Sequence, residues 1–178
     1  METFVIDECD IDKHLDEAIR DTLILCFPHR RETFSRARRW RGNTPLFNVV
    51  VRDGEIVCGY LAVVDRTIQI GDKDVRVAGV GMVGVAPAFR GRRLIDSALS
   101  AAMAEAQERK FNFGLLFTHR PTNSIYARNG WIELPDRKVV RVEGGEEIEM
   151  PPENVVMYYP LTKKDFPSGD IHLLGDKW

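Results

Sequence analysis

Residues 83–94 read Val83-Gly84-Val85-Ala86-Pro87-Ala88-Phe89-Arg90-Gly91-Arg92-Arg93-Leu94, an apolar segment that runs through a proline into a basic turn. An amphipathic pattern follows directly and predicts a helix over about residues 92–110. Backbone N–H groups at the N-terminus of a helix attract anions, and arginine forms paired hydrogen bonds with phosphate oxygens. We therefore expect a strand, a turn and a helix that bind a phosphate-bearing ligand such as a pyrophosphate.

The size and composition of the chain are those of an ordinary soluble globular protein. Its 178 residues suit one domain, so a single domain over residues 1–178 is expected. Charged residues make up 29% and hydrophobic residues 44% of the chain. The formal net charge of −2 gives no general reason to expect nucleic acid or a membrane as a partner. No apolar run approaches the ~20 residues of a membrane helix, and the acidic start Met1–Asp7 differs from a secretory signal.

The cysteines give no sign of a disulfide framework. Cys9, Cys26 and Cys58 are odd in number and scattered along the chain. Their spacing does not match a metal-binding motif either, so no metal is expected. The pattern fits the reducing environment of the cytoplasm.

Charge is distributed unevenly along the chain. The stretch Arg30–Arg41, which we name the basic run, contains six arginines and one acid. Such a run is most often a solvated face, and the alternative is contact with nucleic acid. The stretch Glu143–Trp178 contains eight acids and three lysines. This acidic composition suits a cationic ligand.

Hydrophobic periodicity predicts an alternation of helices and strands. Helices are expected over residues 11–27, 31–40, 92–110 and 121–127, and strands over 46–51, 56–64, 67–70, 75–85 and 113–118. The chain is strand-like again from Trp131 onward, with 139–142 and 155–159 as further candidate strands. Asn129-Gly130 is expected to cap the last of these helices. Antiparallel pairs combined with one crossover predict a mixed sheet in an α+β domain.

Two segments resemble signatures of the GNAT N-acetyltransferases. The first is residues 83–94, which is similar to the acetyl-CoA motif of that family, and the second is Ile125-Tyr126-Ala127-Arg128-Asn129-Gly130-Trp131. The pair spans about residues 80–132, and its order and separation match the family. The resemblance implies an α+β fold with a mixed, mostly antiparallel central sheet, flanked by helices, whose splayed strands bind acetyl-CoA as acyl donor.

One branch of the family is more similar than the others. Arg93 and Ile95 stand where the motif usually has glycines, as in the aminoglycoside 2′-N-acetyltransferases. The end of the chain, Gly175-Asp176-Lys177-Trp178, is similar to the end of members of that branch. This resemblance implies acetylation of an amino group of an aminoglycoside or of kasugamycin, and hence antibiotic resistance. A homodimer is expected by analogy with the family.

The resemblance assigns the donor site residue by residue. Backbone groups of Val83 and Val85 would hydrogen-bond the pantetheine arm, and the N–H of Val83 would also stabilise the oxyanion. A V-shaped opening between the Val83 strand and the Phe113 strand would admit the donor, and Gly84 would allow a close backbone approach. The pyrophosphate would be held by Arg90, Gly91, Arg92, Arg93 and Leu94.

The resemblance also implies roles in the transfer step. Tyr126 would protonate the departing thiolate, and the alternative is a tyrosine of the core. Gly81 stands where the branch has a glutamate as general base, so that base is missing here. The carboxylate of Asp176 and the α-carboxylate of Trp178 are candidates to replace that base, and the alternative for Asp176 is a solvated residue of the tail. Glu153 is a further candidate contact for the acceptor, while His119 is interpreted as a satisfied polar residue and Trp40 as a core residue.

Other functions remain open from the sequence. The same chemistry could act on another small amine, an amino acid or a peptide. A different class is a non-catalytic acyl-CoA-binding sensor or a DNA-binding regulator that uses the basic run.

Overall fold

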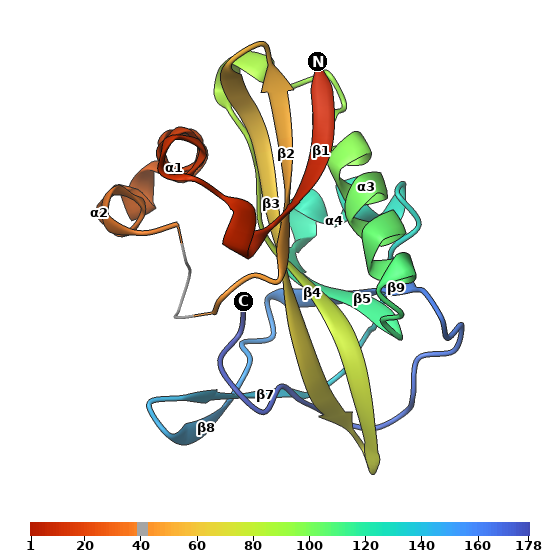
Figure 1. Cartoon of the computed structure of the whole chain (residues 1–178). Coiled ribbons are helices and arrows are strands. Elements are labelled where there is room, and N and C mark those ends of the chain that lie inside the picture. Colours follow the sequence, from red (N-terminus) through yellow and green to blue (C-terminus); the bar gives the residue numbers. More distant parts are fainter. Residues whose placement is uncertain (39–42) are drawn as a thin grey trace. The chain divides into compact units, whose positions relative to one another are not determined.

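The computed structural model describes residues 1–38 and 43–178 (Figure 1). These residues form two compact units. Unit 1 comprises Met1–Val64 and Val80–Glu105, and unit 2 comprises Asp65–Gly79 and Ala106–Trp178. Three elements run from one unit into the other, namely β3 (Ile56–Ile70), β4 (Lys73–Val85) and α3 (Leu94–Glu108). A single domain over the whole chain stays a prediction.

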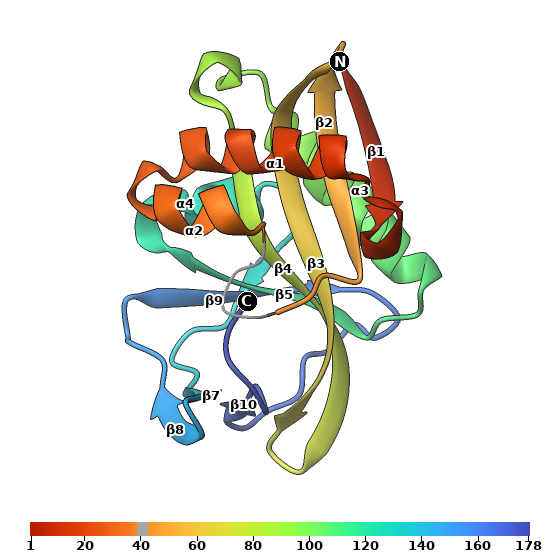
Figure 2. The same ribbon diagram turned by 60° about the vertical axis from the view of Figure 1, so that its left-hand side comes forward.

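Unit 1 is a sheet with helices on both of its faces. Its remaining elements are β1 (Glu2–Asp7), α1 (Lys13–Cys26), α2 (Arg31–Arg36) and β2 (Phe47–Asp53), with 3₁₀ turns at Glu8–Asp10, Pro28–Arg30 and Pro87–Phe89. Both β1 and β3 pair with β2 in antiparallel register. Figures 1 and 2 show α1 and α2 on one face of these strands and α3 on the other. Because both faces are covered, β2 is buried at five successive positions from Phe47 to Val51.

Helix α1 follows from local sequence signals. The carboxylate of Asp12 caps it by accepting a hydrogen bond from the N–H of Leu15 at 2.8 Å. Ile19 and Leu23, one turn apart, are fully buried against the sheet. The hydroxyl of Thr22 donates to the carbonyl of Val57 at 2.7 Å, which ties the helix to β3. The helix expected over residues 11–27 is thus confirmed, slightly shortened at both ends.

A buried ionic network joins the segments of unit 1 that lie far apart in sequence. The guanidinium of Arg38, only 6% exposed, pairs with Glu8 at 2.9 Å and with Asp16 at 2.9 Å. It also donates a hydrogen bond to the hydroxyl of Tyr60 at 3.2 Å, and that hydroxyl in turn donates to Asn48 at 2.5 Å. The side-chain amide of Asn48 in turn donates to Glu8 at 2.9 Å. The network therefore holds the chain after α2 against α1, β2 and β3.

The electrostatics of this network favour its charged form. Burial by itself would lower the pKa of Arg38, but the hydrogen bonds with Glu8 and Tyr60 outweigh it and raise that pKa. Burial likewise raises the pKa of Asp16, and hydrogen bonds from Arg20 and Arg38 outweigh this and leave it lowered. Both the guanidinium and the carboxylate are therefore ionised at neutral pH.

Unit 2 is built around a mixed sheet. Its remaining elements are β5 (Phe113–His119), α4 (Arg120–Ala127), β6 (Ile132–Glu133), β7 (Val139–Glu143), β8 (Glu146–Glu149), β9 (Asn154–Pro160) and β10 (Ile171–His172). The strand order is β6-β9-β5-β4-β3-β10-β7-β8. The pairs β4–β5 and β10–β7 are parallel, and those of β9 with β5 and β6 are antiparallel. The α+β class with a mixed, mostly antiparallel sheet is confirmed.

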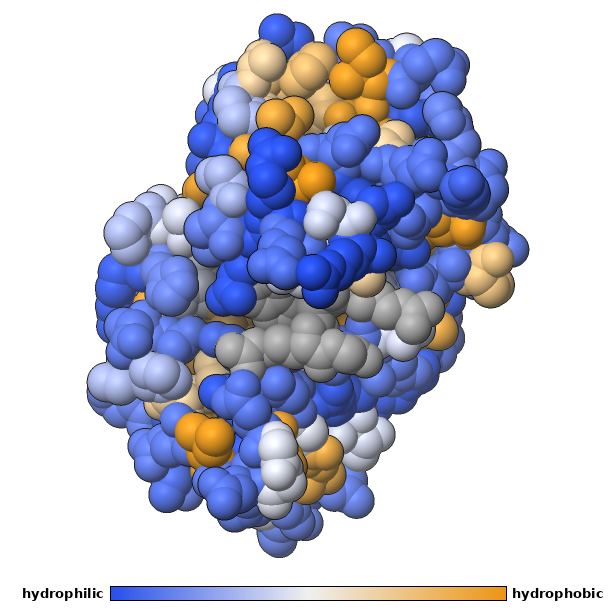
Figure 3. Space-filling view, turned by 90° about the vertical axis from the view of Figure 1, so that its left-hand side faces the viewer, coloured by the Kyte–Doolittle hydropathy of each residue, from blue (hydrophilic) through white to orange (hydrophobic). Residues whose placement is uncertain are grey.

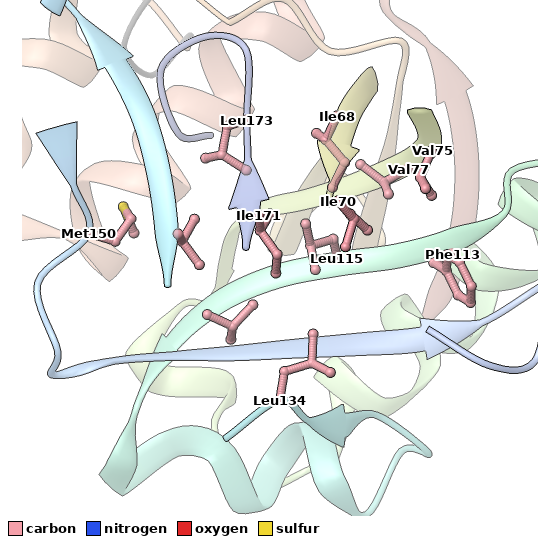
Figure 4. Packing of buried hydrophobic residues seen from close by; sticks show 12 residues of the cluster. Ile68, Ile70, Val75, Val77, Phe113, Leu115, Leu134, Met150, Ile171 and Leu173 are labelled. Carbon is pink, nitrogen blue, oxygen red and sulfur yellow. The ribbon is translucent and has the colours of Figure 1, made fainter. Parts of the chain in front are cut away.

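The core of unit 2 gathers apolar side chains from many short strands. Figure 4 shows this cluster seen from close by. Its fully or nearly buried members are Ile68, Ile70, Val75, Val77, Phe113, Leu115, Leu134, Val139, Met150, Val156, Ile171 and Leu173. Phe117, Tyr158, Phe166 and Trp178 pack against it, partly buried. Elements as short as β10 are therefore held by burial of one or two residues.

Several boundaries differ from those expected. Strand β3 is continuous where two strands were expected, because the polar residues Asp65 and Thr67 lie exposed on a strand. The carboxylate of Asp65 pairs with Arg76 of β4 at 2.7 Å, so these charges support the strand pair. Helix α2 ends at Arg36 and not at residue 40, and Trp40 lies outside the described residues. Strands β1, β8 and β10 were not expected.

The surface carries few exposed large hydrophobic side chains. The face in Figure 3 is mainly hydrophilic, with hydrophobic residues in small separate groups. Within residues 1–38 and 43–178, no helix combines the length and the apolar composition that are needed to cross a membrane.

The ionic network makes a prediction for Arg38. Replacement Arg38→Met should lower the free energy of unfolding by about 3–5 kcal/mol, because it leaves the partly buried carboxylates of Glu8 and Asp16 without this cation. Arg36 is the matched control, since its side chain is 77% exposed and pairs with Glu32 on the same helix. Arg36→Met should leave stability nearly unchanged. Urea unfolding monitored by circular dichroism measures both, and equal losses in the two variants would contradict the network's role.

Candidate functional site

The basic turn lies between β4 and α3 in unit 1. After β4 ends at Val85, the short 3₁₀ turn Pro87–Phe89 leads into four residues, Arg90 to Arg93, before α3 begins at Leu94. The expected helix start at residue 92 is therefore two residues too early. All four turn residues are exposed. The turn thus offers its side chains to solvent at the N-terminal end of a fifteen-residue helix.

The turn has a backbone shape that usually needs glycine. Gly91 has φ +79° and Arg93 has φ +57°, so both adopt left-handed conformations. For a residue with a side chain this conformation costs about 1 kcal/mol. Position 93 is one of the two at which the family motif usually has glycine, and the chain keeps the glycine-like backbone there. Ile95, at the other such position, is half-buried within α3.

The three arginines of the turn are held differently. The Nε–H of Arg90 donates to the carbonyl of Val85 at 3.1 Å, so this side chain folds back onto the end of β4. The guanidinium of Arg92 lies over the ring of Phe89, 5.3 Å from its centre. Arg93 is exposed next to the first turn of α3. Cationic side chains and a helix N-terminus therefore surround one stretch of backbone, which fits a polyanion.

Strand β4 is irregular just before the basic turn. Met82 has φ +53°, a left-handed conformation within a strand, which is typical of a β-bulge. It lies between Gly81 and Val83, and all three residues are half-buried. Nothing in the sequence pointed to this irregularity, since methionine is not a residue that favours positive φ. The backbone next to Val83 is therefore re-aimed relative to a regular strand.

Gly84 is required by packing within unit 1. A Cβ at this position would lie 2.9 Å from Sγ of Cys26, at the end of α1, and 3.4 Å from the ring of Phe27. Any larger residue would therefore push α1 away from β4. Burial raises the pKa of the Cys26 thiol to about 11, so this thiol stays protonated and unreactive near neutral pH. The proposed close approach of Gly84 to a ligand stays a prediction.

Tyr126 is held by the end of α4 in unit 2. Its carbonyl accepts hydrogen bonds from the N–H of Asn129 at 2.8 Å and of Trp131 at 3.2 Å. Gly130 has φ +85°, as expected for the residue that ends this helix. The rings of Tyr126 and Trp131 pack edge to face with centres 6.4 Å apart. The sequence prediction of a short helix closed by Asn129-Gly130 is confirmed.

The phenol of Tyr126 is held in its protonated form. Burial raises its pKa to about 12, and a hydrogen bond with Thr118 opposes this rise in part. A phenol with such a pKa is protonated throughout the physiological range. It is thus in the state that a proton donor requires.

The C-terminal tail is fastened inside unit 2. One carboxylate oxygen of Asp176 accepts hydrogen bonds from Arg141 at 2.6 Å and from the N–H of Lys177 at 2.7 Å. The carbonyl of Asp176 accepts from Arg66 at 2.8 Å. A Cβ on Gly175 would lie 2.5 Å from Nη1 of the same Arg66, so that side chain would have to shift to admit it. Asp176 therefore has structural partners, and its proposed role as a base stays a prediction.

Trp178 and Tyr126 lie on opposite faces of β5. The ring of Trp178 packs against Phe117 with centres 5.3 Å apart, and Arg66 lies 5.5 Å from its centre. The hydroxyl of Thr118, the next residue along the strand, instead lies 2.7 Å from that of Thr122 on α4, the helix that carries Tyr126. Because successive side chains of a strand point to opposite faces, the tail and the tyrosine are separated by β5. The structure thus brings Asp176 and Trp178 together and places Tyr126 apart from them.

Two other site candidates from the sequence are exposed at the surface of unit 2. Glu153 is exposed in the turn between β8 and β9. His119 is also exposed, and its carbonyl accepts a hydrogen bond from Thr122 at 3.0 Å. In the described part of the chain, no group of His, Cys, Asp and Glu side chains has the arrangement of a metal site.

The basic run is only partly a solvated face. Arg30, Arg31 and Arg36 are exposed, as that interpretation predicts. Arg38 is buried in the ionic network, so the interpretation as a solvated face is wrong for this residue. Arg39 and Arg41 lie outside the described residues.

Comparison with known proteins identifies a family. Residues 12–133 match the family described as "Acetyltransferase (GNAT) domain". The chain is also similar to Nodulation protein A of Rhizobium leguminosarum bv. trifolii, with 26% identity over 149 residues, 78% of this chain and 75% of that protein.

Solved structures share the fold at low sequence identity. One is the GNAT family N-acetyltransferase YhbS of Escherichia coli in complex with CoA, with TM-score 0.64, 15% identity and coverage of 98% of this chain and 91% of that one. Another is a GNAT family acetyltransferase of Brucella melitensis in complex with acetyl-CoA, with TM-score 0.63, 15% identity and coverage of 96% and 94%.

The fastened tail makes a prediction for Asp176. Replacement Asp176→Ala should lower the free energy of unfolding by about 1–3 kcal/mol, because it leaves the buried Arg141 with an unmet donor. Glu143, the more exposed partner of Arg141, is the matched control, and Glu143→Ala should cost less. Thermal and urea unfolding measure both. A loss for Asp176→Ala no larger than for the control would show that Asp176 does not fasten the tail.

Proposed function

The chain belongs to the GNAT acetyltransferase family, and we propose that it acetylates an amino group of an aminoglycoside-type antibiotic, with acetyl-CoA as donor. The acceptor would be the 2′-amino group of an aminoglycoside or an amino group of kasugamycin, and its acetylation would confer resistance. The proposed binding of acetyl-CoA rests on one observation, the basic turn with its left-handed residues at the start of α3. The acceptor half rests on the similarity of residues 83–94 and 175–178 to the 2′-N-acetyltransferase branch.

The donor is assigned to the backbone and side chains of the basic turn. The pyrophosphate would accept hydrogen bonds from Arg90, Gly91, Arg92, Arg93 and Leu94. Val83 and Val85 at the end of β4 would bind the pantetheine arm through their backbone groups, as an added strand does. The fold-back of Arg90 onto Val85 supports this reading, because it stiffens the junction of strand and turn.

The transfer step needs a free amine, an oxyanion donor and a proton for the leaving thiolate. The amine attacks the thioester carbonyl, and the N–H of Val83 is assigned to the developing oxyanion. The irregular backbone at Met82 supports the assignment, since it re-aims the amide groups beside it. As the tetrahedral intermediate collapses, Tyr126 donates its proton to the thiolate sulfur, and the amide and the thiol are formed.

The acceptor is proposed to be a cationic amine or amino sugar. Exposed carboxylates cluster in unit 2, on the β7–β8 hairpin and the turn that follows it, and they suit ammonium groups. They are Glu143, Glu146, Glu147, Glu149 and Glu153. Gly81 has no side chain that could act as a base. We therefore assign removal of the acceptor's proton to a water molecule held by a carboxylate, and Asp176 and the carboxylate of Trp178 are the candidates for that carboxylate. A homodimer remains part of the proposal by analogy with the family.

A second candidate keeps the chemistry and changes the acceptor to another small amine or a peptide. A DNA-binding regulator is less favoured, because Arg38 of the basic run is buried and Arg36 pairs with Glu32. Non-specific binding of DNA needs exposed cations along one face.

The acceptor proposal predicts a substrate spectrum. Thiol release from acetyl-CoA should be stimulated by 2′-amino aminoglycosides or by kasugamycin, and mass spectrometry should find a single added acetyl group on the product. Aminoglycosides with a 2′-hydroxyl serve as matched controls and should not stimulate release if the 2′-amino group is the target. Turnover only with polyamines or peptides would reassign the acceptor. Salt-sensitive retention of DNA without turnover with any amine would support the regulator instead.

The proposed role of Tyr126 as proton donor predicts how removal of its hydroxyl group changes kcat. Tyr126→Phe should lower kcat at least roughly tenfold with little change in the KM for acetyl-CoA, because it removes only the proton donor. Tyr158→Phe is the matched control, since the ring of Tyr158 packs against Phe113 in the core of unit 2. Steady-state kinetics over a range of pH measure both variants, and a wild-type kcat in Tyr126→Phe would end the assignment.

A further inference from the structure

A single buried arginine joins two carboxylates of unit 2. The side chain of Arg141, on β7, is only 10% exposed, and it pairs with Asp176 through Nη1 at 2.6 Å and with Glu143 through Nη2 at 2.5 Å. Within the described part of the chain its Nε–H has no hydrogen-bond partner. The side chain is therefore oriented through its two terminal nitrogens, one toward each carboxylate.

The two carboxylates come from segments that lie far apart in the sequence. Glu143 is the last residue of β7, two positions after Arg141, so both side chains lie on the same face of that strand. Asp176 belongs to the C-terminal tail, which runs beside β7, since the N–H of Val142 donates to the carbonyl of Gly175 at 2.8 Å. The fold of unit 2 thus brings both carboxylates to one guanidinium.

The carboxylates are more accessible than the guanidinium that holds them. The side chain of Glu143 is 44% exposed and that of Asp176 is 21% exposed. Glu146, which is also exposed, lies directly opposite Glu143 in the β7–β8 hairpin. Like charges opposite each other on paired strands repel, and a bound ammonium group would offset this repulsion. Negative charge therefore remains in excess at this surface.

We propose that Arg141 is a positioning residue for the acceptor, and that its two terminal nitrogens hold Glu143 and Asp176 in the arrangement that binds an ammonium group. This inference rests on the proposed function, in which the acceptor is a cationic amine. Arg141 does not touch the acceptor itself and acts through the two carboxylates.

The shape of the guanidinium explains why an arginine suits this position. Its planar fork presents N–H groups in fixed directions, so it can hold two carboxylates in a defined relation to each other. A lysine ammonium is a point charge on a flexible stem and does not fix two partners in this way. Without a cation, Glu143 and Asp176 would repel each other and move apart.

A purely structural role of Arg141 makes a different prediction. If this side chain only fastened the tail, its loss would lower stability and leave the kinetics of the acceptor unchanged. Arg137 provides the matched control, because its Nη1 donates to the carbonyl of Gly169 at 2.5 Å. Arg137→Met therefore removes a contact between an arginine and the C-terminal segment that involves no carboxylate.

The first experiment needs no acceptor. Coupling of glycine ethyl ester to carboxylates by a carbodiimide, located by mass spectrometry, measures how firmly each carboxylate is held. In Arg141→Met, labelling of Glu143 and Asp176 should be at least roughly fivefold faster, because both lose their cation. Arg141→Lys should protect at most one of the two. Glu149, which pairs with Lys138 at 3.6 Å, is the internal reference.

Two results of the labelling experiment would overturn the proposal. Unchanged labelling of both carboxylates in Arg141→Met would show that the arginine does not hold them. Full protection of both in Arg141→Lys would show that the positive charge, and not the fork, is what matters.

The second experiment connects Arg141 to the reaction, with acetyl-CoA as donor and with kasugamycin or spermidine as acceptor. Arg141→Met should lower kcat/KM for the acceptor at least roughly tenfold and leave the KM for acetyl-CoA within about twofold, because the basic turn is unchanged. Arg137→Met should leave both values near those of the wild type. In a protein that carries Glu143→Gln and Asp176→Asn, Arg141→Met should cause no further loss of acceptor kcat/KM, since the arginine acts through those two groups.

These readouts separate the positioning role from the proposed function. Faster labelling in Arg141→Met together with a wild-type kcat/KM for the acceptor would make Arg141 a structural contact and overturn its positioning role. A wild-type protein that acetylates neither kasugamycin, nor any aminoglycoside, nor spermidine would refute the cationic acceptor and with it the role of Arg141 toward it. The labelling would in that case still test whether Arg141 holds both carboxylates.

A second variant keeps the test valid if Arg141→Met does not fold. Arg141→Lys retains the positive charge, and its acceptor kcat/KM should still fall at least about threefold, because the fork is lost. Unfolding midpoints measured by circular dichroism identify the variants that are folded at the assay temperature. A folded Arg141→Lys with the wild-type kcat/KM for the acceptor would contradict the proposal.

Discussion

Burial of the guanidinium of Arg38 is the constraint on which unit 1 depends. A buried charge is tolerated only with close partners, and these partners come from Glu8, from Asp16 on α1 and from the strands β2 and β3. Helix α1 is thereby fixed on the sheet, and its last residue, Cys26, packs against Gly84 of β4. The position of β4 in turn determines where the basic turn begins. An ionic contact far from the turn thus contributes to its shape.

Unit 2 uses the two faces of one strand for different purposes. On one face of β5, Phe113 and Leu115 belong to the apolar cluster of unit 2 (Figure 4). Phe117 and Trp178 pack against that cluster. On the other, the Thr118 hydroxyl meets that of Thr122 on α4. The pairing of β5 with β4 covers only Val77–Gly79, whereas β9 accompanies β5 along its whole length. The C-terminal end of β5 is therefore paired with a strand on one side only, and polar side chains can lie there.

Local signals allowed much of the fold to be predicted, and tertiary placement explains what was missed. Pro28, Asn129 and Gly130 mark helix ends through their own backbone preferences, so α1 and α4 were found. The two residues of β10 carry no periodic pattern, and a methionine at positive φ in β4 has no sequence signature. Arg38 looked like its exposed neighbours, because charge alone does not reveal a buried partner thirty residues away. Helix periodicity did predict the apolar stripe of α3, although its start was placed two residues early.

The left-handed backbone at Arg93 has a consequence for how ligand binding and folding are linked. In the free protein the turn carries an unfavourable conformation and several like charges close together, and both lower the stability of the fold. A bound polyanion would neutralise those charges while using the same backbone shape. Any ligand that binds only the folded chain shifts the folding equilibrium toward it. A polyanion held at the turn would therefore also stabilise the folded state of unit 1, so that occupancy and folding are coupled there.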